Sequence, residues 1–236
     1  MKKSINTKSI REIMLVLVII FIGVAITNKA KAQSFHNYTY YGFGLSLSVP
    51  TQTLKSNIPQ LNGLKVNFIG SNIGGMIANK HGKLKANFGT YYSGSSVPYE
   101  IDMIRGNISA NIYLLRLTEV VKAHLFEPYA VFGVSEQVSK FHGDFFSNDT
   151  QNSSNPTSQP LAGKVNSIRM NVGAGVELQL ENDYQKFVHL FAEVTYGSPL
   201  SSSSSNKEFS QTKVMNAITF NVGINFGIVK ISRYKR

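Results

Sequence analysis

Apolar and polar residues alternate with a period of two over long stretches of this chain. The last stretch, 217–228, has apolar side chains on one face and small or polar ones on the other, namely Ile218, Phe220, Val222, Ile224, Phe226 and Ile228 against Ala217, Thr219, Asn221, Gly223, Asn225 and Gly227. This alternation predicts a β-strand that is longer than the average of about five or six residues. The small, polar face would fill a soluble core poorly, so the pattern is typical of a barrel strand whose apolar face contacts lipid.

The same alternation predicts about eight strands, over residues 38–49, 64–79, 84–93, 104–114, 123–140, 165–181, 187–196 and 217–228. The connections that follow the odd-numbered strands are 50–63, 94–98, 141–163 and 198–212, and most of them are long. Those that follow the even-numbered strands are 80–83, 118–122 and 182–185, and all are short. Membrane barrels sort their loops in this way, with long external loops and short periplasmic turns. We therefore expect both termini in the periplasm.

Three segments carry a resemblance to a known family. Aromatic or β-branched residues alternate with glycine and other small residues in 128–133, 172–177 and 220–227. In these segments the chain resembles the small outer-membrane β-barrel proteins of Gram-negative bacteria, the eight-stranded OmpA/OmpX-like group. The resemblance implies an all-β fold, a closed antiparallel up-and-down transmembrane barrel of about eight strands. Such barrels often end on an aromatic residue, whereas this chain continues past Phe226 into 232–236.

The first 33 residues have the features of a secretory signal peptide. A basic start precedes an apolar run at 13–26, and 30–33 offers a small-residue cleavage site. The run is short for a transmembrane helix of roughly 20 residues, which disfavours the alternative of an uncleaved anchor. We therefore predict a cleaved leader at 1–33 and a barrel domain at 34–236 with a short basic tail.

Composition removes several classes of function. The leader and the C-terminal tail carry most of the formal net charge of +11, which leaves no basic groove for nucleic acid. The chain has no cysteine, so disulfides, thiolate catalysis and cysteine zinc sites are excluded. We expect no cofactor, no metal site and no catalytic residue.

The inward face of an eight-stranded barrel is filled by side chains. The alternation places a predicted polar network there, made of Arg105, Arg169, Glu177, Gln179, His189 and Glu193. Because a buried charge needs a partner, we expect Arg105 or Arg169 to pair with Glu177 or Glu193. Tyrosines near the predicted strand ends should form aromatic girdles at the membrane interfaces, at positions 38, 40, 41, 91, 92, 99, 129 and 196.

Two arrangements could carry chemistry instead. His189 and Glu193 share a strand face, but residues four apart on a strand are separated by roughly 13 Å, too far to ligate one metal. A lipid-directed hydrolase or acyltransferase would need a serine, a histidine and an acid held together. Ser135 with His124 or His142 is conceivable, although no spacing supports the choice.

These observations predict a non-enzymatic integral protein of the cell outer membrane, with a structural or surface-interaction role. Its expected partners are outer-membrane lipid and lipopolysaccharide, and proteins that contact loops 141–163 and 198–212. Four alternatives stay open: an accessory component of a secretion or surface-assembly machine, a lipid-modifying enzyme, a small-solute porin, and a soluble periplasmic β-sandwich. No ligand or solute can be named, because barrels specify these in loops without local chemical signatures.

Overall fold

A computed structural model describes residues 38–79, 81–93, 100–115, 126–143, 161–182, 186–204 and 206–231. Its strands are β1 (Tyr38–Lys55), β2 (Lys65–Ala78), β3 (Gly82–Ser93), β4 (Glu100–Tyr113), β5 (Phe126–His142), β6 (Leu161–Asn182), β7 (Lys186–Ser204) and β8 (Lys213–Ile231), with a short 3₁₀ helix η2 (Lys207–Phe209). Each strand pairs with the next, and β8 pairs with β1, so the sheet closes into a barrel. This confirms the predicted fold and excludes the sandwich.

Closure is complete along the first and last strands. The antiparallel ladder between β1 and β8 runs from the pair Tyr38–Ile231 to the pair Lys55–Lys213, with one register shift between Gln52 and Leu54. An open edge in lipid would leave N–H and C=O groups unpaired, at a cost of several kcal/mol each. The closed ladder removes that cost. Within the described residues, no helix is long and apolar enough to cross a membrane.

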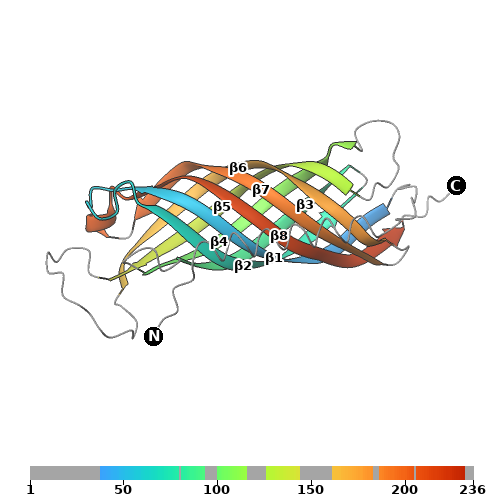
Figure 1. Ribbon diagram of the computed structural model, residues 1–236, viewed down its shortest axis with the longest axis horizontal. Coiled ribbons are helices and arrows are strands. Elements are labelled where there is room, and N and C mark those ends of the chain that lie inside the picture. Colours follow the sequence, from blue (N-terminus) through green and yellow to red (C-terminus); the bar gives the residue numbers. More distant parts are fainter. Residues whose placement is uncertain are drawn as a thin grey trace.

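The two ends of the barrel differ in the strand termini and connections that they carry. β1 begins and β8 ends at one end, on the right in Figure 1. The connection 56–64 and η2 lie at the opposite end, on the left, which we call the loop end. The predicted leader at 1–33, most of the predicted loop 141–163 and the turn 118–122 lie outside the described residues.

Several strands extend further toward the loop end than predicted. β1 continues to Lys55, β6 begins at Leu161, and β7 continues to Ser204 through a serine run. That run pairs with β6, from Ile168 opposite Ser201 to Val165 opposite Ser204. Cross-strand backbone hydrogen bonds hold these polar segments in the sheet, whereas the sequence pattern recognised only segments with an apolar face.

The outer surface of the barrel carries a broad apolar belt. Large exposed side chains come from every strand, among them Phe43 (61 % exposed), Leu45, Ile73, Phe88, Ile108, Phe132, Met170, Val194, Phe220 and Ile228 (63 %). Soluble proteins rarely expose an apolar surface of this extent, whereas such a surface matches the lipid-facing band of a membrane barrel.

The tyrosine prediction was correct for only some positions. Tyr41, Tyr92 and Tyr196 are exposed on the outer face, as a girdle requires. Tyr40, Tyr91 and Tyr129 are instead buried inside the barrel. They occupy the inward phase of their strands, so nearness to a strand end does not by itself identify a girdle residue. The side chain at position 38 and residue 99 lie outside the described part of the chain.

At the loop end, the barrel is closed by a core of apolar side chains that we call the apolar cap. Its members come from seven strands and two connections: Leu54, Ile58, Leu61, Val66, Phe68, Tyr91, Ile101, Met103, Phe141, Val165, Phe209 and Val214. All are at least 95 % buried. The sequence pattern missed this core because Ile58, Leu61 and Phe209 are isolated apolar residues in segments that are otherwise polar.

Two local features fold these connections inward. In the connection 56–64, the N–H groups of Leu61 and Asn62 donate to the Ile58 carbonyl at 3.0 and 3.1 Å, which makes a tight turn. Gly63 follows with φ +76°, a conformation that glycine adopts without strain. In η2, Phe209 packs on Phe141 with ring centroids 5.2 Å apart. The predicted loops 50–63 and 198–212 are therefore largely ordered parts of the barrel end.

Candidate functional site

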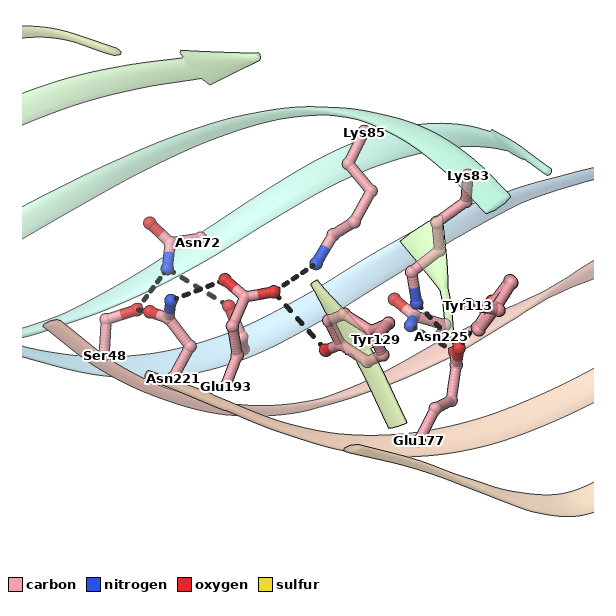
Figure 2. A network of polar contacts seen from close by, with 11 residues as sticks. Ser48, Asn72, Lys83, Lys85, Tyr113, Tyr129, Glu177, Glu193, Asn221 and Asn225 are labelled. Carbon is pink, nitrogen blue, oxygen red and sulfur yellow. Dashed lines mark hydrogen bonds and ion pairs between the residues drawn. The ribbon is translucent and has the colours of Figure 1, made fainter. Parts of the chain in front are cut away.

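The candidate site is the lumen of the barrel, below the apolar cap. Its polar side chains follow from the same alternation that makes the outer surface apolar: every inward position of a strand lies between two outward ones. Figure 2 shows the centre of this network, with two lysines of β3 directed toward two glutamates of β6 and β7.

Glu177 of β6 is contacted by side chains from four other strands. Lys83 Nζ lies 2.8 Å from Oε2, and the Tyr113 hydroxyl donates to the same oxygen at 2.7 Å. Asn225 Nδ2 donates to Oε1 at 3.0 Å, and His189 Nδ1 lies 3.3 Å from it. The carboxylate therefore joins β6 to β3, β4, β8 and β7, and it is 1 % exposed.

Glu193 of β7 forms a second centre, nearer the loop end. Lys85 Nζ lies 3.8 Å from Oε2, the Tyr129 hydroxyl donates to Oε2 at 3.3 Å, and Asn221 Nδ2 donates to Oε1 at 3.1 Å. Lys85 also sits over the ring of Phe191, 4.2 Å from its centroid. The attraction between a cation and the ring face adds to the stability of the buried ammonium.

From Asn221 the network continues to β1 and β2 (Figure 2) and from there returns to β3. The Ser48 hydroxyl of β1 donates to Asn221, and Asn72 of β2 donates to Ser48 and, at 3.1 Å, to Ser46. The Tyr91 hydroxyl of β3 donates back to Asn72. Hydrogen bonds thus cross the lumen and tie strands far apart in the sequence.

The two arginines lie closer to the apolar cap and use neutral partners. Arg105 donates to Thr219 and to Asn171, both at 3.2 Å. Arg169 donates to the backbone carbonyls of Gly197 and Met215 at 2.8 and 2.7 Å. Neither forms an ion pair with a described glutamate. The expectation that Arg105 or Arg169 pairs with Glu177 or Glu193 was therefore wrong.

The register of the strands explains why the arginines do not meet the glutamates. Both arginines come from positions nearer the loop end than the glutamates, so the cations that meet the acids are the lysines of β3. Lys83 was assigned to the turn 80–83, but the turn is tighter: Asn79 Oδ1 accepts from the N–H groups of His81 and Gly82 at 2.8 and 3.1 Å. β3 begins at Gly82, and Lys83 is already an inward residue.

The structure places all six sequence-predicted network residues inside the barrel. Arg105, Arg169, Glu177, Gln179, His189 and Glu193 are each at most 8 % exposed. The prediction omitted the groups that contact the two glutamates, namely Lys83, Lys85, Tyr113, Tyr129, Asn221 and Asn225. Lys85 could have been found, because it alternates with the outward residues Leu84 and Ala86.

The side chains considered for chemistry are not assembled. Ser135 is buried in the lumen and accepts from Asn171 at 3.0 Å, whereas His142, on the opposite face of β5, lies 3.4 Å from Asp102. His124 lies outside the described residues. His189 contacts Glu177 rather than Glu193. Among the residues that the structure describes, no cluster of histidines and acids could hold a metal ion.

A small cavity lies in the described part of the lumen. Its volume is about 30 Å³, and its walls include Lys85, Arg105, Asn171 and Glu193. A space of this size takes one or two water molecules. Around it, side chains from opposite walls meet across the lumen, as expected for a barrel of this strand number.

Comparison with solved structures identifies the same fold. Neisserial surface protein A superposes with a TM-score of 0.52 at 12 % identity, over 78 % of this chain and 95 % of that one. Ail of Yersinia pestis, solved in complex with the heparin analogue sucrose octasulfate, gives a TM-score of 0.41 at 12 % identity, over 83 % of this chain and 100 % of that one. OprG of Pseudomonas aeruginosa gives a TM-score of 0.39 at 11 % identity, over 84 % of this chain and 98 % of that one. No family model and no curated protein matches the sequence.

These neighbours are small outer-membrane β-barrels, and this chain is an eight-stranded closed barrel of the same architecture. At 11–12 % identity, the similarity concerns the fold alone. The role of the protein must be argued from its own residues.

Proposed function

We propose that this protein is an integral outer-membrane protein with a non-conducting barrel and no enzymatic activity, and that its role is structural or based on surface contacts. The long connections face the outside, and both termini face the periplasm. The observation that carries the proposal is the closure of the lumen, which has two independent parts.

The first part is the polar network. Glu177 and Glu193 with their lysine, tyrosine and asparagine partners bridge opposite walls of the barrel and exclude a water-filled pore. Opening a path here would separate buried ion pairs, which costs roughly 3–5 kcal/mol for each partner left alone.

The second part is the apolar cap, which lies across the loop end. Phe141 and Phe209 are both 0 % exposed, and the connection 56–64 contributes Ile58 and Leu61. A small solute would have to displace this core before it reached the polar lumen. The cap therefore disfavours the porin alternative.

The orientation is supported by the loop lengths and by the outer surface. The apolar belt with Tyr41, Tyr92 and Tyr196 on the same face matches a membrane-spanning band with aromatic margins. The loop end carries the longer connections, which outer-membrane barrels direct outward. Contacts with partner proteins would then be made by the loop end, including the part of 141–163 beyond β5.

Single-channel recording in planar bilayers tests the closed lumen. Heat-modifiable gel mobility of the same sample should first show that the barrel is folded. We expect no steady conductance from wild type. A steady, large open conductance from folded protein would overturn the proposal. Labelling of the exposed Lys207 on intact cells should succeed if the loop end faces outward, and labelling only after outer-membrane permeabilisation would contradict the orientation.

A further inference from the structure

A group of lysines lies on the outer face of the barrel at the loop end, beyond the apolar belt. Lys55 ends β1, Lys65 begins β2 and Lys213 begins β8. All three are exposed. We call them the lysine cluster.

The sheet register brings these three charges together. Lys55 and Lys213 are directly opposite each other across β1 and β8, and Lys65 is opposite Thr53, one outward position before Lys55. Directly opposed residues have Cβ atoms roughly 5 Å apart, and diagonal neighbours lie within about 8 Å. Three ammonium groups can therefore converge on one ligand.

No acid compensates the cluster within its own part of the sheet. The strands β1, β2 and β8 contain no aspartate or glutamate, and neither does the connection 56–64. None of the three lysines forms an ion pair with a carboxylate in the described part of the chain. Like charges placed directly opposite on neighbouring strands destabilise a sheet. An anion bound between Lys55 and Lys213 would remove that repulsion.

A second opposed pair shows the contrast. Lys140 of β5 lies opposite Lys164 of β6, but it also lies opposite Asp102 of β4 on its other side. That pair therefore has an acid built into the same sheet, whereas the lysine cluster has none.

The position of the cluster defines the kind of anion. On β2, Ile69 belongs to the outward face, and Asn67 and Lys65 follow it toward the loop end. Four residues of strand span roughly 13 Å, and strand tilt of about 35–45° brings this to about 10 Å along the membrane normal. Lysine side chains bend their charged ends toward the membrane interface, so the amines reach the level of lipid headgroups.

We propose that Lys55, Lys65 and Lys213 bind the phosphorylated headgroup of a lipid whose acyl chains lie on the apolar belt below. The outward orientation of the loop end, which is part of the proposed function, makes lipid A of the outer leaflet the matching lipid. The site thus anchors a phosphate with ammonium groups while the strand surface beneath it takes the acyl chains.

Native mass spectrometry of the folded mature chain in detergent tests this site, with diphosphoryl lipid A and phosphatidylcholine as probes. The test variant is Lys55→Gln/Lys213→Gln. The matched control is Lys140→Gln/Lys164→Gln, which also removes an opposed pair at the loop end. We expect wild type to bind lipid A at least tenfold more tightly than phosphatidylcholine. The affinity of the test variant for lipid A should fall about tenfold, and that of the control variant less than threefold.

Equal losses in both variants would mean that binding depends on general charge, and no loss in the test variant would exclude the site. Inorganic phosphate at the same concentration should not displace lipid A. Displacement would assign the site to free phosphate and overturn the lipid proposal. Heat-modifiable mobility of each variant shows that it is folded. Since conductance is measured separately, a failure of lipid binding is distinguishable from a failure of the closed-lumen proposal.

Discussion

Replacing Glu177 by glutamine removes the negative charge at the centre of the polar network while it keeps the shape of the side chain. In wild type the carboxylate accepts from Lys83 at 2.8 Å, Tyr113 at 2.7 Å and Asn225 at 3.0 Å. Glutamine can still accept from some of these donors through its carbonyl oxygen. It cannot neutralise Lys83, which is 4 % exposed.

The cost follows from the buried ammonium that is left behind. Removing one partner of a buried ion pair destabilises by about 3–5 kcal/mol, because the other charge stays desolvated. The ring of Tyr129, 5.0 Å from Lys83 Nζ, stabilises the ammonium by about 0.5–2 kcal/mol in wild type and variant alike, so it does not reduce this difference. We therefore expect Glu177→Gln to lower the free energy of unfolding by about 3 kcal/mol or more.

A second substitution separates the ion pair from general damage to the lumen. Lys83→Met removes the orphaned charge and leaves a flexible apolar side chain among the rings of Tyr113, Tyr129 and Phe191, with which sulfur makes favourable contacts. The double variant should be more stable than Glu177→Gln alone by about 0.5–3 kcal/mol, the size of coupling energies between contacting residues.

The measurement is equilibrium unfolding in denaturant, followed by circular dichroism and heat-modifiable mobility, since the chain has no tryptophan to report by fluorescence. Glu208→Gln is the control: the same chemical change at an exposed position of η2, outside the membrane-facing strands, should shift stability by less than about 1 kcal/mol. If Glu177→Gln costs no more than this control, or if the double variant is no more stable than Glu177→Gln alone, the ion pair does not stabilise the barrel.

Two further predictions concern the cap and the belt. Phe209→Ala should lower the free energy of unfolding by about 3–5 kcal/mol, because it empties a fully buried position of the apolar cap. The barrel should still insert into membranes. Loss of insertion would show that the cap is needed for assembly. Leu45→Arg should cost about 2–4 kcal/mol in lipid, since it lies in the middle of the belt on β1. Ile228→Arg lies at the margin of the belt, between the girdle residue Tyr41 and Lys186, and should cost at most about 1 kcal/mol; equal costs at both sites would contradict the placement of the belt.

The sequence alone predicted the strands and the faces of most of their residues. In β8, for example, Phe220, Phe226 and Ile228 were predicted on the apolar outer face and are exposed. Thr219 and Asn225 were predicted on the opposite face and are buried. The period of two is a property of the backbone itself, so it needs no knowledge of neighbouring strands. The same pattern placed Glu177 and Glu193 inside.

The partners of those inward residues could not be predicted in the same way. Lys83 and Glu177 are 94 residues apart, and their meeting depends on the register of every strand pair between them and on closure of the barrel. The predicted turn 80–83 ended two residues too late, since β3 begins at Gly82, and this error moved Lys83 from the lumen into a loop.

What the sequence determined by itself was the inversion of polarity, an apolar outside and a polar inside, because alternation along a strand is local and survives without any tertiary information. Only the tertiary structure decided which charges pair and how the lumen closes. Lys83 meets Glu177, and Ile58, Leu61 and Phe209 reach a common core, since these contacts join distant segments whose local sequence is polar or unremarkable. Register and closure, rather than the hydrophobic pattern, convert an amphipathic sheet into a sealed barrel.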